Sequence, residues 1–311
     1  GLGSLIATKE GTRKKPRLML TAHMDEVGFM LQNITDGGYL RLLPLGGWIA
    51  SNLPGQRVHI HGSKGPVEGI VAAVPPHFKK EPKSELKVED LLVDVGAASK
   101  EEVASLGLNL GDLITPSSQF AIYNDKLLAN KGWDDRVGCA VLIAAMKKLN
   151  KHPNTVVAAA TVQEEVGSRG AVTAVEVTKP QAAIVLEGPP ADDLPGVAKD
   201  SPQGALGQGC QIRLYDPSTI IHRSFWRWVT ELAHKHKIAH QLAVRQGGAT
   251  DARAIHMAHG GIPTVVLGVP VRHAHSHSGL IHLDDFRATL KLTLAILKKL
   301  DNKILKSLLP E

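Results

Sequence analysis

Three short runs of uninterrupted apolar residues constrain the fold of this chain more than any other feature. They are TVVAAATV (155–162), AAIVLEG (182–188) and PTVVLGV (263–269). Strands have this pattern when helices cover both faces of their sheet, because both sides of the strand are then buried. Helix-like stretches alternate with these runs, at 137–149, 224–236 and 284–297. The alternation predicts an α/β domain with a mixed central sheet flanked by helices.

A different pattern occupies the middle of the N-terminal half. One apolar strand is predicted from Arg17 to Leu31, and short β-like runs then follow, VHIHG, VEGIVAAV and LLVDVGA, between turns rich in Gly, Pro and Lys. This pattern predicts a small β-rich domain inserted into the α/β domain. We therefore assign 1–45 and 121–311 to the α/β domain and 46–120 to the insertion.

Composition excludes several classes of protein. Hydrophobic residues make up 43% and charged residues 21%, as in an ordinary globular protein. The net charge is +6, but Lys and Arg are scattered along the chain and aromatics are 4%, so we expect no nucleic-acid binding. No apolar run is long enough to span a bilayer, so we expect no membrane contact. Cys139 and Cys210 cannot build a disulfide scaffold, and no signal peptide is visible, so we expect a cytoplasmic protein.

Residues that can bind a metal ion stand at the ends of the apolar segments. His23 follows the first apolar strand, and Asp25 projects to the same side and can hold the other ring nitrogen. Asp134 and Asp135 directly precede the helix-like stretch at 137–149. Each motif also has an ordinary interpretation, namely a core or turn hydrogen bond for His23 and a helix cap for the two acids.

Carboxylates also follow two of the buried runs. Glu164 and Glu165 come directly after 155–162, and Glu187 ends the run at 182–188. Adjacent glutamates face different ways, so one can bind a metal ion while the other moves a proton. Open α/β sheets gather their ligands at such strand ends, although a solvated loop or a turn explains each residue as well.

The last motif is RHAHSHSGLIH, which contains His273, His275, His277 and His282. The first three would share one face of a strand, so spacing alone does not choose between a cluster of ligands, one ligand and none. The strand ends converge on one crevice, where two histidines and three carboxylates suit a pair of Zn²⁺, Co²⁺ or Mn²⁺ ions.

Six motifs, in this order, resemble the tetrahedral (TET-type) aminopeptidases, a family of glutamyl and deblocking enzymes with co-catalytic metal ions. They are AHMDEVGF (22–29), KGWDDRVG (131–138), VQEEVGSRGA (162–171), LEG…PG (186–196), GGATDA (247–252) and GVPVRHAHS (268–276). The resemblance covers nearly the whole chain. It implies a zinc-peptidase-like α/β catalytic domain, an inserted β-barrel dimerisation domain, and dimers that assemble into hollow tetrahedral dodecamers.

The resemblance also implies a role for each candidate residue. One metal ion is held by His23, Asp134 and Glu187, and the other by Asp134, Glu165 and His275. The pattern from Arg272 to Ser276 selects His275 among its neighbours.

Glu164 is then the general base, and Asp25 orients the ring of His23. The peptide bond between Asp134 and Asp135 is expected to be cis.

The chain departs from the family pattern at several positions. Most family members have a helix before the first strand, whereas this chain opens with GLGSLIATKEG, which predicts a strand and a turn that follow an earlier segment. Trp133, His273-Ala274 and Ala249 replace residues more usual in the family. We expect these changes to alter the shape of the pocket and not the ligand set.

The expected activity is removal of N-terminal residues from peptides by a water activated by two metal ions. The alternatives are a two-metal deacylase of N-acyl amino acids and a non-catalytic assembly scaffold. Some family members are labelled glucanases, but glycoside hydrolysis needs two acids that flank a sugar and no paired metals. Acidic, neutral and basic preferences all occur on this scaffold, so the preferred N-terminal residue stays open.

Overall fold

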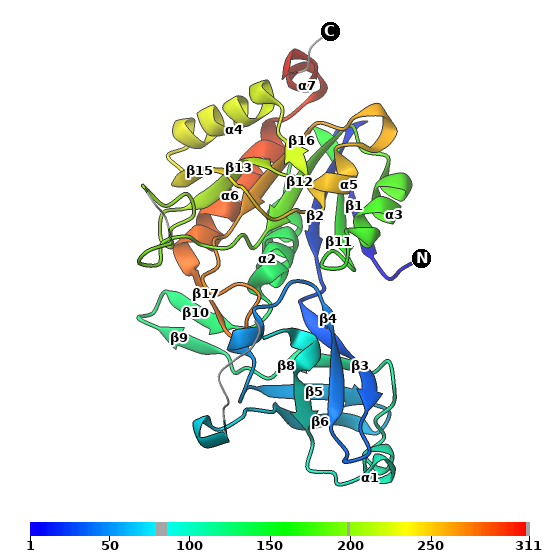
Figure 1. Ribbon diagram of the computed structural model, residues 1–311. Helices are drawn as coiled ribbons and strands as arrows, with labels where there is room; N and C mark the ends of the chain where they lie inside the picture. The colour runs from blue at the N-terminus through cyan, green and yellow to red at the C-terminus, as the bar shows by residue number, and fades with distance from the viewer. Residues whose placement is uncertain (79–85, 198–199, 309–311) are drawn as a thin grey trace. The chain divides into compact units, whose positions relative to one another are not determined.

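The computed structural model describes residues 1–78, 86–197 and 200–308 and divides into two compact units (Figure 1). The α/β unit comprises 1–25, 121–274 and 279–311. The barrel unit comprises 26–120 together with the short segment 275–278.

A mixed sheet forms the centre of the α/β unit, in the order β1-β11-β2-β12-β16-β13-β14, with β15 beside β13. Its strands are β1 (Leu5–Lys9), β2 (Arg13–His23), β11 (Asn154–Thr161), β12 (Ala182–Glu187), β13 (Cys210–Asp216), β14 (Thr219–Ile220), β15 (His240–Val244) and β16 (Thr264–Gly268). β11, β2, β12 and β16 run parallel. Their carboxyl ends therefore meet at one edge of the sheet.

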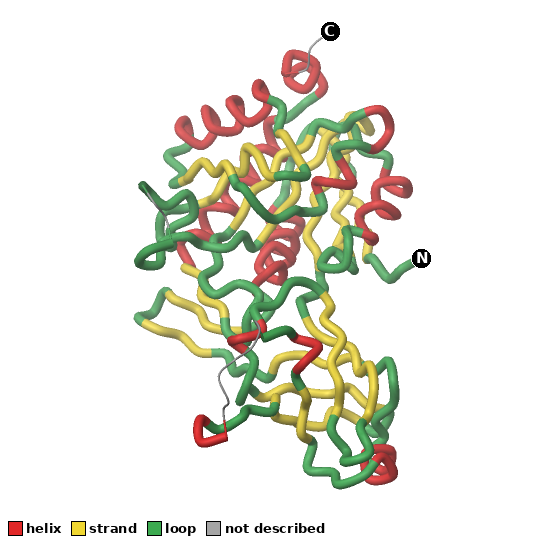
Figure 2. Tube along the Cα trace, in the orientation of Figure 1, coloured by secondary structure: helices red, strands yellow, loops and turns green. Residues whose placement is uncertain are grey.

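Helices cover both faces of this sheet (Figure 2). They are α2 (Trp133–Lys148), α3 (Arg169–Thr178), α4 (Arg223–Lys235), α5 (Ala252–Ile255) and α6 (Leu283–Lys299). Successive side chains of β2 point to opposite faces, so Leu20 packs in the core with α2, α4 and α6, whereas Met19 packs in the core with α3 and α5. The predicted α/β fold class is confirmed.

Smaller elements complete the α/β unit. β9 (Ala121–Tyr123), β10 (Leu127–Asn130) and β17 (Gly279–His282) form a separate sheet in the order β17-β10-β9. α7 (Asn302–Leu308) follows α6. No helix in the described part of the chain is long and apolar enough to cross a membrane.

The barrel unit is a closed barrel with the strand order β3-β4-β7-β6-β5-β8. The strands are β3 (Gly28–Ile34), β4 (Leu40–Leu45), β5 (Arg57–Gly62), β6 (Gly65–Val71), β7 (Leu92–Asp94) and β8 (Leu113–Pro116), and the helix α1 (Lys100–Ser105) lies between β7 and β8 in the chain. Phe29, Leu42, Ile60 and Ile114 are fully buried in its core.

The barrel begins earlier in the chain than the apolar pattern predicts. One strand was expected from Arg17 to Leu31, with the insertion starting at 46, but β2 ends at His23 and β3 begins at Gly28. β3 and β4 pair with the barrel strands β8 and β7. The pattern runs through the break because both strands are buried, one in each unit, so hydrophobicity alone does not mark where one unit ends.

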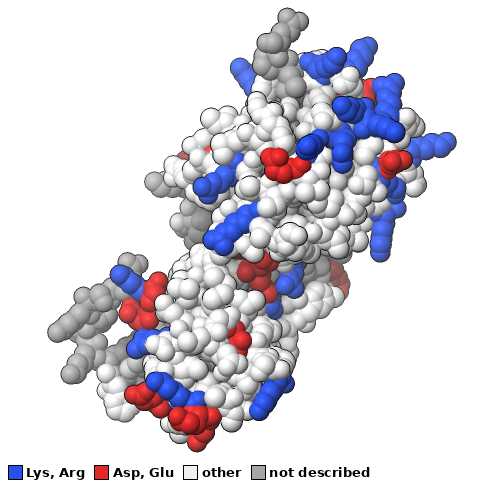
Figure 3. Space-filling view, turned by 90° about the vertical axis from the view of Figure 1, so that its right-hand side faces the viewer, with Lys and Arg blue, Asp and Glu red and all other residues white. Residues whose placement is uncertain are grey.

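Positive charge is concentrated on part of the α/β unit, where Figure 3 shows Lys and Arg side chains gathered. Exposed Lys and Arg residues also occur at the start of β2 and at the ends of α2 and α6, namely Arg13, Lys14, Lys15, Lys147, Lys148, Lys298 and Lys299. Cations at the last turns of α2 and α6 are favourable beside the helix dipoles. These residues are scattered in the sequence because three distant segments supply them.

We expect Leu20→Ala to lower the free energy of unfolding by about 2–5 kcal/mol, because Leu20 is fully buried in a central strand. Leu5 lies on the edge strand β1 and is 61% exposed, so Leu5→Ala should change it by less than about 0.5 kcal/mol. Urea unfolding followed by circular dichroism measures both variants. Equal losses would contradict the central position of β2.

Candidate metal centre

The parallel strands bring most of the predicted ligands to one edge of the sheet. β2 ends at His23, β12 ends at Glu187, and Glu165 follows the end of β11 by four residues. Asp134 joins them from the first turn of α2. Ligands in open α/β sheets collect at the carboxyl ends of strands, and this arrangement follows that rule.

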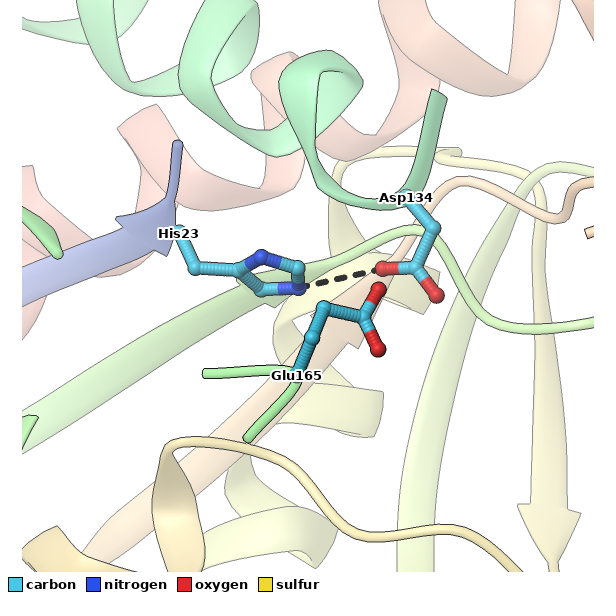
Figure 4. A group of neighbouring side chains, drawn as sticks. All are labelled: His23, Asp134 and Glu165. Carbon is cyan, nitrogen blue, oxygen red and sulfur yellow. Dashed lines mark hydrogen bonds and ion pairs between the residues drawn. The ribbon is translucent and has the colours of Figure 1, made fainter. Parts of the chain in front are cut away.

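The donor atoms of these residues are close enough to share a cation. His23 Nε2 lies 3.1 Å from Asp134 Oδ1 and 3.7 Å from Glu187 Oε1. In Figure 4 the imidazole of His23 points toward the carboxylate of Asp134, with Glu165 beside both, and one ligand atom from each lies within 4.8 Å of the others. A second group of the same kind contains His23, Asp135 and Glu187. Since Zn²⁺ takes N and O donors at about 2.0–2.2 Å, such spacings can close around an ion.

Glu187 provides the test of whether a cation fits here. The residue is 5% exposed, and its Oε2 has no hydrogen-bond partner among the described residues. A buried carboxylate oxygen without a donor is costly, and a bound cation would remove that cost. The imidazole and carboxylate donors are also those that Zn²⁺, Co²⁺ and Mn²⁺ accept.

Asp25 orients both His23 and the loop after β11. Nδ1 of His23 lies 3.1 Å from the Asp25 carbonyl oxygen and 3.6 Å from its carboxylate, which turns Nε2 toward Asp134. The same carboxylate accepts hydrogen bonds from the backbone N–H groups of Glu164 and Glu165, each at 3.1 Å. Burial raises the pKa of Asp25, but the contacts with His23 and the two N–H groups outweigh burial and lower it.

Asp135 is a structural residue for which the sequence predicted no separate role. It is fully buried, and its carboxylate accepts from the backbone N–H of His23 at 3.1 Å and of Gly138 at 2.9 Å. Asp135 therefore caps the start of α2, as one of the two interpretations of the acid pair predicted, and it connects α2 to the end of β2. Asp134 instead faces the group of candidate metal ligands. The peptide bond between these two aspartates is cis, as the resemblance implies. The sequence feature that could have indicated this role of Asp135 is Gly138, since a Cβ at that position would lie 2.2 Å from Asp135 Oδ1.

Asp251, in the GGATDA motif, is a second buried acid that sequence reasoning did not single out. Its Oδ2 lies 2.5 Å from the Thr161 hydroxyl, which lies 3.1 Å from the carbonyl oxygen of Ala22. This chain of contacts joins the ends of β11 and β2, from which Glu164 and His23 follow. Burial raises the pKa of Asp251 to about 6.

The carboxylates of the centre repel one another. Burial, and then the charge of Glu187, raise the pKa of Glu164 to about 9. Burial raises the pKa of Glu187 to about 7 and that of Asp135 well above its usual range. Burial lowers the pKa of His23, but hydrogen bonds to Asp134, Asp25 and Glu187 outweigh this and raise it well above its usual range. Crowded carboxylates with raised pKa values are a site where added positive charge is strongly favoured.

The histidine-rich segment is not a strand. His273 and His275 have φ values of 58° and 57°, so the alternation expected of a strand does not apply. His282 caps α6 by accepting from the Asp284 backbone N–H, and His277 is buried with its ring 6.0 Å from that of Trp48. Nδ1 of His275 lies 2.9 Å from the Gly47 carbonyl oxygen, within the barrel unit. Its place among the ligands stays a prediction from the motif.

Two ion pairs hold the loop that follows Glu187. Arg272, three residues before His275, makes hydrogen bonds of 2.7 and 2.5 Å to the two carboxylate oxygens of Asp193. Arg245 makes one of 2.8 Å to Asp192. The arginine in the histidine motif therefore has a structural partner on the segment that follows a predicted ligand.

Comparison with known proteins supports the resemblance. A model of the M42 glutamyl aminopeptidase family matches residues 3–292. The glutamyl aminopeptidase of Lactococcus lactis subsp. cremoris is 34% identical over 313 residues, which cover 97% of this chain and 86% of the relative.

Solved structures agree with these sequence matches. The TET aminopeptidase of a marine sediment Thaumarchaeota archaeon is 39% identical, with a TM-score of 0.95 over 99% of this chain and 87% of that chain. The TET1 peptidase of Pyrococcus horikoshii is 35% identical, with a TM-score of 0.84 over 96% of this chain and 88% of that chain. The resemblance predicted from six motifs is confirmed.

We expect cation binding by the metal-stripped protein to release protons and to strengthen as pH rises through about 7, since Glu187 is protonated below its pKa of about 7 and a cation must displace that proton. Titration calorimetry with Zn²⁺ at pH 6.5 and 8, in buffers of different ionisation enthalpy, measures both effects. Glu187→Gln should weaken binding and reduce the proton release. Binding that releases no protons at either pH would contradict the crowding of these carboxylates.

Proposed function

This chain belongs to the M42 glutamyl aminopeptidase family, and on that basis we propose that it hydrolyses the amino-terminal peptide bond with two metal ions and Glu164 as general base. It is a metal-dependent aminopeptidase. The observation that carries the proposal is the convergence of His23, Asp134, Glu165 and Glu187 at one sheet edge, with Asp25 holding the loop of Glu164.

Five residues supply the proposed ligands. His23, Asp134 and Glu187 would hold one ion, and Asp134, Glu165 and His275 the other, so Asp134 would bridge. The overlapping donor groups around His23 support the first set, and the Asp134–Glu165 proximity together with the motif at 268–276 supports the second. Bound by these residues, Zn²⁺, Co²⁺ or Mn²⁺ ions would supply Lewis-acid chemistry that activates a water molecule and polarises the substrate carbonyl group.

In this proposal Glu164 moves a proton and does not bind an ion. Its backbone N–H donates to Asp25, and the Ser168 hydroxyl donates to Oε1 at 3.3 Å. The carboxylate would take a proton from the attacking water and deliver it to the leaving amine. Burial and the charge of Glu187 raise the pKa of Glu164 in the metal-free centre, and bound cations would lower it, so that the ionised carboxylate can accept the proton.

The excess of carboxylates favours a substrate with a free α-amino group. A protonated amine is a cation that the acids around the centre would attract, whereas an N-acylated substrate lacks that charge. This charge preference supports the aminopeptidase over the deacylase that the ligand set would also allow.

We also propose that the barrel unit is the dimerisation domain and that the dimers form a dodecamer. The TET1 peptidase of Pyrococcus horikoshii can assemble into a tetrahedron or a large octahedral shell. Such a particle would admit peptides and exclude folded proteins. Sedimentation analysis decides the point, because a dimer or a monomer at micromolar concentration contradicts the proposed dodecamer.

We expect Glu164→Gln to keep both metal ions and to lower kcat by about 10²–10⁴-fold, because the amide keeps the shape of the side chain and cannot accept the proton. Glu176→Gln is the matched control, since Glu176 is an exposed residue of α3 in the same unit. Metal content by mass spectrometry and turnover of an aminoacyl anilide measure both. Near-normal kcat for Glu164→Gln would show that another group is the base.

Substrate chemistry tests the activity itself. After chelation and return of Zn²⁺, Co²⁺ or Mn²⁺, the enzyme should release the aniline from glutamyl, leucyl or lysyl anilides and leave their N-acetyl derivatives intact. The panel also identifies the preferred N-terminal residue. Faster hydrolysis of N-acetyl amino acids than of free aminoacyl anilides would support the deacylase and contradict the aminopeptidase mechanism proposed for this centre.

A further inference from the structure

The histidines of the proposed ligand set share one local arrangement. Nδ1 of His23 lies 3.1 Å from the carbonyl oxygen of Asp25, and Nδ1 of His275 lies 2.9 Å from that of Gly47. A neutral imidazole carries one N–H, so donation from Nδ1 leaves Nε2 as the nitrogen with the lone pair. In both cases, the ring is therefore set to bind a metal ion through Nε2.

These carbonyl groups belong to different compact units. Asp25 lies in the α/β unit with His23, whereas Gly47 lies in the barrel unit with His275. We propose that residues 46–48, the 46–48 loop, are a positioning element that fixes the tautomer and ring orientation of His275. This inference rests on the proposed ligand set and adds to it a group that orients one of the ligands.

The 46–48 loop is anchored in the barrel core. Trp48 Nε1 donates to the carbonyl oxygen of Gly28 at 3.0 Å, and its ring stacks on fully buried Phe29 with centroids 4.6 Å apart. Gly46 has a φ of 85°, a conformation that glycine adopts without steric cost. The turn at Gly46 and the anchor at Trp48 thus fix the direction of the Gly47 carbonyl group between them.

The segment that carries His275 packs against the same loop. His277 is buried with its ring 6.0 Å from Trp48, and the Ser278 hydroxyl lies 3.3 Å from that of Ser118. His275 is therefore held by Gly47 at its own ring and by these contacts just beyond it. Trp48 serves both contacts, since it anchors the loop and supports His277.

The imidazole of His275 lies beside the position that a side chain of residue 47 would occupy. The φ of Gly47 is outside the left-handed region, so the backbone would accept any residue. A Cβ at this position would lie 3.4 Å from His275 Nδ1 and 3.9 Å from Cε1. A single Cβ at these distances is in ordinary van der Waals contact with the ring, whereas the methyl groups of a valine would add bulk beside it.

The test replaces Gly47 with valine and measures metal binding. We expect Gly47→Val to bind its first Zn²⁺ ion as the wild type does and its second about 10–100-fold more weakly, the usual effect of losing a group that orients a ligand. Competition with a chelator measures both affinities. Gly37→Val is the matched control, because Gly37 also has an ordinary φ in the barrel unit and a Cβ there would meet Tyr39 at 3.8 Å.

His275→Ala separates this inference from the proposed function. If His275→Ala loses the second ion and Gly47→Val keeps wild-type affinity for both, the inference is overturned and the proposed ligand set stands. If His275→Ala keeps both ions at full affinity, the ligand set fails and the inference with it.

A second variant covers the case in which Gly47→Val does not fold. Trp48→Phe keeps an aromatic ring on Phe29 but removes the donor to Gly28. It should also weaken the second ion selectively, with the oligomeric state and melting temperature of the wild type. Unchanged affinity for both ions in a folded Trp48→Phe protein would then overturn the proposal.

Discussion

The carboxylate of Asp25 is the contact on which the rest of the centre depends. It accepts hydrogen bonds from the backbone N–H groups of Glu164 and Glu165 and lies beside the ring of His23. Because strands β2 and β11 are parallel neighbours, their ends already lie side by side, and Asp25 converts that proximity into a fixed orientation. The proposed base and a proposed ligand therefore both take their backbone position in part from Asp25.

Two buried carboxylates connect the segments around this contact. Asp135 ties the start of α2 to His23, and Asp251 joins the ends of β11 and β2 through Thr161. Burial of these two carboxylates is unfavourable and raises their pKa values, and the charge of Glu187 adds to the effect at Asp135. These carboxylates therefore lower the stability of the metal-free fold, and the same carboxylates give the site a strong attraction for cations.

One of the proposed ligands, His275, depends on a contact within the barrel unit. His275 is the proposed ligand that the α/β unit does not contain, and its ring is held by a carbonyl group of the barrel. Arg272, three residues earlier, is held by Asp193 of the α/β unit. Arg272 and His275 are therefore each held by a contact within their own unit, although only three residues separate them.

The sequence by itself determined the fold class, the family and the position of candidate ligands at strand ends. Periodicity, residue type and chain order carry that information, because a buried strand and the residue that ends it are local properties. Only the tertiary structure decided where β2 stops and β3 begins, and that Asp135, Asp251 and Gly47 support His23, Thr161 and His275. These partners meet through contacts between segments remote in the sequence, and no local pattern of hydrophobicity or spacing specifies such contacts.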